Sequence, residues 1–139
     1  MKTIVLTLML AAMATMGFAQ DITGTWITYD DATQKPASRV ELTLRDGKMY
    51  VQVKELLNQP AEVAAQAKCT ECKGKLKNQP VVGMFIVDGA KLDGKEYQGT
   101  IIDPKNGKEY KAKIWPENGA LNVRGYLGPF FRTQVWKRK

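Results

Sequence analysis

The chain has 139 residues, with 21 Lys and Arg against 14 Asp and Glu and a formal net charge of +7. It contains no histidine, which excludes Ser-His-Asp and Cys-His catalytic arrangements and the common zinc sites. The basic residues are spread along the chain, and the longest run is the final residues 137–139. This spread predicts a solvated surface, so we expect no nucleic-acid interface.

Residues 1–19 have the features of an export signal. Lys2 supplies a positive start, residues 4–16 are apolar, and residues 17–19 form a small-x-small cleavage site. The apolar run is shorter than the ~20 residues that a membrane-spanning helix needs. We therefore expect a signal peptide at 1–19, one domain over 20–139, and no membrane span after cleavage; an uncleaved anchor is the alternative.

The first three predicted strands cover residues 22–29, 38–45 and 48–55. The second and third alternate between apolar and polar residues, so each has one apolar face. Asp46-Gly47 between them is a hairpin turn, because Asp and Gly tolerate the positive φ that a two-residue connection requires. These strands are therefore expected to be antiparallel neighbours.

Residues 58–79 interrupt this pattern. Residues 60–67 have helix-forming composition, with proline where a first turn accepts it. Cys69 and Cys72 follow and are the only cysteines, so in an oxidising compartment they are expected to form a disulfide. A redox or metal pair is the alternative, but zinc would need two more ligands and no βαβ pattern surrounds the motif.

Five more strands are predicted in the second half of the chain. Most are separated by tight turns such as Asn118-Gly119. Their expected ranges are 81–88, 96–102, 108–115, 120–126 and 130–137. Eight strands joined mainly by tight turns predict an all-β, antiparallel up-and-down barrel with a short helix between strands three and four, because closure removes the exposed edges. A two-sheet sandwich is the alternative.

The tripeptide Gly24-Thr25-Trp26 opens the first strand. A tryptophan near one end of a barrel can close that end, and an arginine stacked on its ring adds about 0.5–2 kcal/mol. This Gly-x-Trp pattern with a late arginine resembles the signature of lipocalin-like barrels (calycins). Arg124 and Arg132 are the candidate partners, and we favour Arg132 because the last strand must pair with the first. An ordinary core tryptophan is the alternative.

Motifs along most of the chain resemble a bacterial domain-of-unknown-function family, the one numbered 2147. The matching residues are Gly24-Thr25-Trp26, Thr28, Asp30-Asp31, Cys69 to Gly74, Ile102 to Gly107, Tyr110, Arg124 to Gly128, Arg132-Thr133 and Trp136. The resemblance implies a lipocalin-like barrel exported by Gram-negative bacteria, periplasmic or secreted, that binds a small apolar molecule. It implies no catalytic residues.

Two acidic segments need a separate interpretation. Asp30 and Asp31 are adjacent, so they would point in opposite directions and cannot act as an acid/base pair. Residues 103–107 are explained by a turn. We expect solvated carboxylates and no metal site.

We expect a non-enzymatic carrier of an apolar or acidic amphipathic, fatty-acid-like ligand, without a cofactor. The expected lining residues are Trp26, Val40, Leu42, Val51, Val53, Tyr97, Tyr110 and Arg132. Alternation shows which residues share a face of a strand but does not decide which face points inward. The alternatives are an envelope interaction module with a filled barrel, whose surface or residues 58–79 bind a partner, and a thiol redox protein using Cys69 and Cys72.

Overall fold

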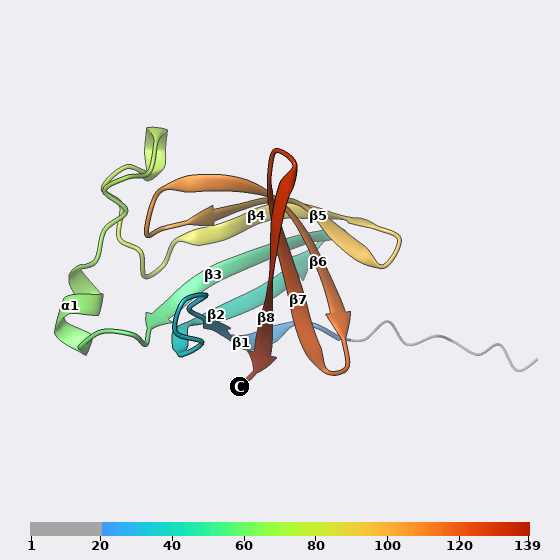
Figure 1. Ribbon diagram of the computed structural model, residues 1–139, viewed down its shortest axis with the longest axis horizontal. Helices are drawn as coiled ribbons and strands as arrows, with labels where there is room; N and C mark the ends of the chain where they lie inside the picture. Colours follow the sequence, from blue (N-terminus) through green and yellow to red (C-terminus); the bar gives the residue numbers. More distant parts are fainter. Residues whose placement is uncertain (1–20) are drawn as a thin grey trace, which may run out of the picture.

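The computed structural model describes residues 21–139, so the expected signal peptide lies outside the described residues. Eight strands form a closed barrel (Figure 1). They are β1 (Gly24–Tyr29), β2 (Pro36–Arg45), β3 (Lys48–Leu56), β4 (Phe85–Asp93), β5 (Glu96–Asp103), β6 (Lys108–Glu117), β7 (Ala120–Leu127) and β8 (Phe130–Arg138). A short helix, α1 (Ala61–Gln66), and a 3-10 turn, η1 (Gly74–Leu76), lie between β3 and β4.

The topology is an up-and-down meander in which every strand pairs antiparallel with its neighbours in sequence. The barrel closes where β1 meets β8, through Trp26 opposite Arg138 and Ile27 opposite Lys137. This confirms the predicted eight-stranded barrel, and the sandwich alternative is wrong.

The two ends of the barrel differ in their connections. At one end, here the closed end, two-residue turns join β2 to β3, β4 to β5 and β6 to β7. Asn118 and Gly119 have φ of 52° and 78°, as the expected hairpin turn requires. At the other, open end lie the longer connections 30–35, 57–84 and 104–107, on the left in Figure 1. Long loops therefore surround only one opening of the barrel.

The segment before β4 departs from the sequence prediction. Residues 81–84 were expected to begin a strand, but β4 begins at Phe85. Gly83 has a φ of 97°, and its N–H donates to the carbonyl of Val53 on β3. Val81 and Met84 are nevertheless buried, which explains the apolar run. The helix expected at 60–67 is confirmed as α1, and no helix within residues 21–139 has the length and apolarity to span a bilayer.

The closed half of the barrel is packed with large side chains. Inward residues of several strands form one cluster of buried apolar residues. Large members with almost no exposure are Trp26, Leu42, Met49, Ile114 and Leu121. The alternation along the strands has placed their apolar faces inward, as a barrel core requires.

Candidate functional site

The open half of the barrel contains a cavity of about 790 Å³. Its inner wall is formed by apolar residues that also belong to the core, including Val53, Ile86, Val123 and Trp136. Loops 30–35 and 104–107 surround its mouth, and residues from both line it. The volume falls in the range of about 300–1,000 Å³ that is typical of small-molecule sites.

The structure places the predicted lining residues in two groups. Val53, Tyr110 and Arg132 line the cavity. The others do not line it and are buried in the packed core: Trp26, Val40, Leu42, Val51 and Tyr97. Their inward direction follows from alternation, but their position along the strand puts them below the cavity. For this reason the prediction that these five residues line the cavity is wrong.

Trp26 closes the far end of the barrel, as expected. Its side chain is 1% exposed, and its Nε1 donates to the carbonyl oxygen of Ile22 at 2.9 Å. The guanidinium of Arg138 lies over the ring, with Cζ 4.4 Å from the centroid. The same guanidinium donates to the carbonyl oxygens of Thr23 and Asp21. Gly24, Trp26 and Arg138 form the barrel-end plug. Through it, the end of the last strand β8 is tied to the start of the first strand β1.

The predicted arginine partners of Trp26 were wrong. The β1–β8 register sets Arg138 opposite Trp26, whereas Arg132 lies six residues earlier, roughly 20 Å away along a strand. Arg124 lies over the rings of Trp115 and Phe131 instead. The choice of the last strand was correct, but the position on it was not.

Gly24 is required by this plug. Its φ is +114°, and a Cβ at this position would approach Arg138 Nη1 to 3.2 Å. The group that comes closest to this position is thus the guanidinium of Arg138. A larger residue would strain the backbone and displace the arginine.

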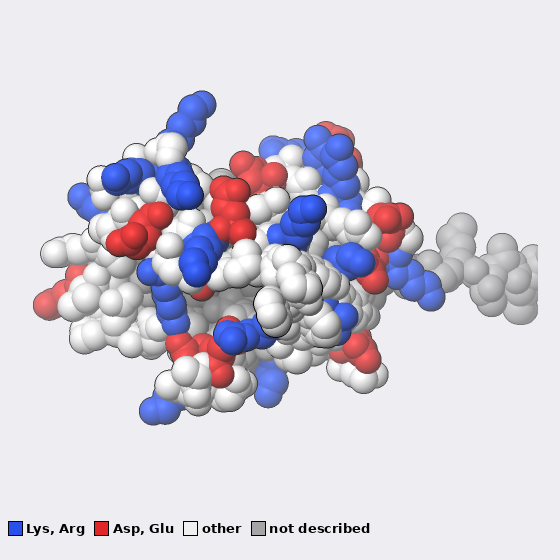
Figure 2. All heavy atoms as spheres, turned by 45° about the horizontal axis from the view of Figure 1, so that its top comes forward, with Lys and Arg blue, Asp and Glu red and all other residues white. Residues whose placement is uncertain are grey.

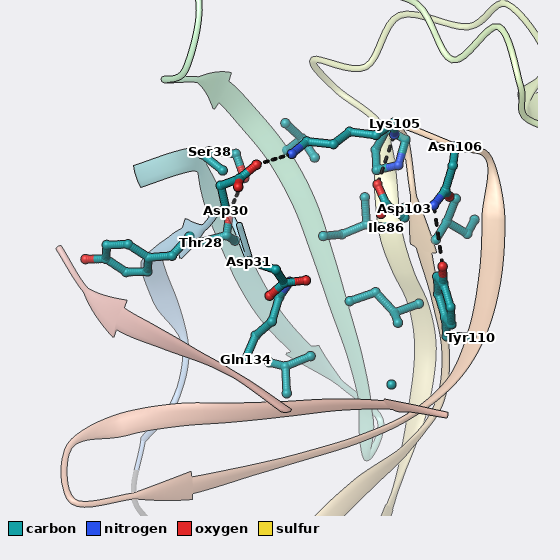
Figure 3. A pocket seen from close by; sticks show the side chains of 18 of the residues that line it. Thr28, Asp30, Asp31, Ser38, Ile86, Asp103, Lys105, Asn106, Tyr110 and Gln134 are labelled. Atoms are coloured by element: carbon teal, nitrogen blue, oxygen red, sulfur yellow. Dashed lines mark hydrogen bonds and ion pairs between the residues drawn. The ribbon is translucent and has the colours of Figure 1, made fainter. Parts of the chain in front are cut away.

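Two ion pairs cross the mouth of the cavity, and Figure 3 shows the one between Asp30 and Lys105. Asp30 pairs with Lys105 of the β5–β6 loop at 2.5 Å, and Asp31 pairs with Arg132 of β8 at 3.2 Å. Gln134 Nε2 also donates to Asp31 at 3.0 Å. The adjacent carboxylates point to different partners, as expected, but they are not simply solvated. They tie loop 30–35 to both sides of the mouth.

Asp30 is the most perturbed acid of the mouth. The hydrogen bond from Lys105, followed by those from the backbone N–H groups of Thr33 and Ala32, lowers the pKa of Asp30 to about 2. These donors favour the charged carboxylate. The side chain is therefore ionised at neutral pH and keeps its contact with Lys105.

Polar groups also lie within the cavity wall. Thr28 Oγ1 and Ser38 Oγ share a buried hydrogen bond of 2.5 Å, and both residues line the cavity. One hydroxyl donates and the other accepts, so the accepting hydroxyl keeps its own proton for a further bond. Trp136 Nε1 donates to Gln134 at 3.2 Å. The apolar wall thus offers a ligand a small number of polar contacts.

The predicted disulfide between Cys69 and Cys72 is confirmed, with a Cα–Cα distance of 5.3 Å. The two cysteines and Met84 form a second buried cluster. Gly107 packs so closely on Glu71 that a Cβ would overlap its backbone. The disulfide loop therefore supports the loop that carries Lys105.

Several cavity residues were missed by sequence analysis. Lys105 and Gln134 were hidden because their partners come from distant loops, 75 and 103 residues away. Trp136 and Val123 lie on the faces of β8 and β7 that point inward, which alternation alone does not identify. Within residues 21–139, no three Asp, Glu, Cys or His side chains group to hold a metal ion.

Residues 24–138 match a family described as uncharacterized protein conserved in bacteria (DUF2147). The chain belongs to this family. The expected family is therefore confirmed over nearly all of the barrel. A bacterial protein with a disulfide is compatible with export.

A solved structure with a similar fold is titled "Protein HP1028 from the human pathogen Helicobacter pylori belongs to the lipocalin family". It superposes with a TM-score of 0.69 at 21% identity, over 86% of this chain and 83% of that chain. The comparison with curated proteins gave no match. The similarity shows that this DUF2147 chain has a lipocalin-like fold.

Proposed function

We propose that this DUF2147 protein binds one small apolar or amphipathic molecule, of the fatty-acid class, in the open half of its barrel. The observation that carries the proposal is the cavity of about 790 Å³, which has an apolar inner wall and charged residues at its mouth. Clefts of this kind bury most of a small ligand and orient it with few polar groups. The lipocalin-like fold agrees with this use.

The chemistry of the wall favours an amphipathic ligand with an acidic end. Its apolar part would contact Val53, Ile86 and Trp136, where the cavity meets the core. Lys68 lines the cavity and forms no ion pair within residues 21–139. It is the cation we assign to an acidic head group, since Lys105 and Arg132 already hold carboxylates.

We propose that the protein acts as a non-enzymatic carrier in the periplasm or outside a Gram-negative cell. The disulfide and the bacterial family support export. Asp30 and Asp31 at the mouth are each paired with a basic side chain, so these acids hold the loops in place. Binding without chemistry accounts for the cavity and its polar groups.

The alternatives explain less of the structure. A barrel filled throughout is inconsistent with the open half, although it describes the closed half well. Thiol redox chemistry needs an accessible sulfur, and Cys69 and Cys72 are 0% and 3% exposed. The disulfide instead packs on Met84 as part of the loop structure.

Native mass spectrometry of the protein from its own host, followed by titration with palmitate, tests the proposal. We expect a bound apolar molecule and saturable palmitate binding. Ala67→Trp, which fills the cavity wall, should weaken binding at least about tenfold, the equivalent of about 1.4 kcal/mol. Ala61→Trp, on the exposed surface of α1, should not. No bound molecule and no palmitate binding, or equal binding by the two variants, would contradict it.

A further inference from the structure

The hairpin between β7 and β8 projects from the barrel at the top of Figure 1. Its tip carries Leu127, Phe130 and Phe131 around a Gly-Pro turn, and these side chains are 54%, 76% and 62% exposed. Single exposed apolar residues are common, but adjacent ones at a projecting tip form a patch. Such a patch marks a contact surface.

Aromatic and basic residues lie behind this tip. Arg124 Cζ is 4.7 Å from the ring centroid of Phe131 and 5.1 Å from that of Trp115. Lys113 Nζ is 5.6 Å from the centroid of Tyr126, and that ring packs against Phe131. The arrangement combines cations with amphipathic rings directly behind an apolar tip.

The hairpin and the neighbouring strand β6 carry more cations than carboxylates, and Asp31 of loop 30–35 neutralises one of the cations, Arg132. In β6 to β8 the only carboxylates are Glu109 and Glu117, and Glu117 accepts hydrogen bonds from Trp115 and Asn122. The space-filling view, which brings the top of Figure 1 forward, shows uncharged side chains bordered mostly by Lys and Arg (Figure 2). This charge is complementary to an anionic surface.

We infer that the β7–β8 hairpin docks the protein on an anionic phospholipid bilayer. The tip residues Leu127, Phe130 and Phe131 enter the boundary between head groups and acyl chains. Trp115 and Tyr126 lie at head-group level, where such rings are favoured, and Arg124 and Lys113 meet lipid phosphates. The occupant of this surface is therefore a lipid membrane, and the docking does not depend on what the cavity holds.

Docking in this way would bring the cavity to the membrane. Leu127, Phe130 and Phe131 also line the mouth, so a docked hairpin places the entrance at the bilayer surface. A lipid-derived ligand could then pass between bilayer and barrel without crossing water. This passage of a ligand from bilayer to barrel rests on the proposed function, whereas the docking itself does not.

Co-sedimentation of the protein with vesicles tests the docking. Vesicles of phosphatidylcholine and phosphatidylglycerol in equal amounts should bind it, and pure phosphatidylcholine should bind it at least about tenfold more weakly, since each cation near an anionic surface contributes about fivefold. The double substitution Phe130→Ser/Phe131→Ser should weaken binding at least about tenfold. The control Leu92→Ser removes a residue of similar exposure, 51%, at the closed end and should leave binding unchanged.

Both tip phenylalanines are largely exposed, so the double variant is expected to fold, and its thermal midpoint checks this. Phe130→Ser alone, at the most exposed position, gives an intermediate loss if the tip inserts. Lys111 lies opposite Tyr126 of β7, next to Lys113 in the contact with the hairpin. Lys111→Gln/Lys113→Gln should weaken binding to the anionic vesicles and leave binding to pure phosphatidylcholine unchanged.

Three results would overturn the inference. They are no binding to anionic vesicles, equal binding by the tip variant and the protein itself, and an equal loss in Leu92→Ser. A concentration-dependent dimer that the tip substitutions dissociate, with no vesicle binding, would show that a second copy covers the hairpin instead. Vesicle binding should survive Ala67→Trp, which fills the cavity wall away from the hairpin, and this separates the test of docking from that of the proposed function.

Discussion

The two halves of the barrel are built from the same strands but are filled differently. In the closed half, short hairpins bring large inward side chains such as Trp26, Leu42 and Ile114 together with almost no exposure. In the open half, long loops hold the strand ends apart around a cavity of about 790 Å³. The position of an inward residue along its strand therefore decides whether it packs in the core or lines the cavity.

Removing the plug should have the largest effect on the closed half. Trp26→Ala is expected to lower the free energy of unfolding by about 3–5 kcal/mol, because it empties a fully buried indole site. Chemical denaturation measures this loss. A change below about 1 kcal/mol would show that the indole packing contributes little to the closed half.

The disulfide lies at the open half of the barrel and should contribute less to the free energy of unfolding than Trp26 does. Cys69→Ser/Cys72→Ser is expected to lower the free energy of unfolding by about 2 kcal/mol, since the cross-link closes only a short loop. The same experiment under reducing conditions should give the unsubstituted protein the same loss. Unchanged stability in both cases would show that packing alone holds residues 69–72.

Two arginines of β8, at opposite ends of the barrel, should differ in their contribution to stability. Arg138→Ala should cost about 1–2 kcal/mol, because it removes a cation–π contact and charged hydrogen bonds to two carbonyl oxygens. Arg132→Ala removes an exposed ion pair and should cost at most about 1 kcal/mol. Thermal and chemical denaturation of both variants measures the difference. A larger loss for Arg132→Ala would reverse the assignment of the plug.

The smallest expected effect is a pH dependence at the mouth. The pKa of Asp30 is lowered to about 2 in the folded protein, mainly by Lys105, against about 3.9 when unfolded. Its contribution to stability is therefore present above about pH 4 and is lost as the pH falls toward 2. Asp30→Asn should flatten the decline of the denaturation midpoint between pH 5 and 2, whereas Asp88→Asn, at another exposed position, should not.

Much of the barrel could be predicted from sequence because its signals are local. Alternation and tight turns are set by neighbouring residues, so the eight strands, the hairpins and the disulfide were predictable. Residues 81–84 looked like a strand because they are apolar, but Gly83 turns the chain while Val81 and Met84 stay buried. Burial and strand geometry are separate properties, and only the first is visible in composition.

The site was harder to predict because it depends on contacts between distant loops. Asp30 meets Lys105 and Asp31 meets Arg132 only after the barrel closes. The stacking arginine depends on the exact β1–β8 register, which no local pattern specifies. Alternation groups the residues that share a face of a strand but does not give the depth of each residue in the barrel.

Two tryptophans can report directly whether a ligand enters the open half of the barrel and not the closed half. Trp136 lines the cavity, whereas Trp26 lies in the packed core without lining it. We would compare quenching by a brominated fatty acid in two single-tryptophan variants, Trp26→Phe/Trp115→Phe and Trp115→Phe/Trp136→Phe. We predict saturable quenching of Trp136 and little quenching of Trp26; equal quenching, or none at Trp136, would contradict the division of the barrel into a packed half and a binding half.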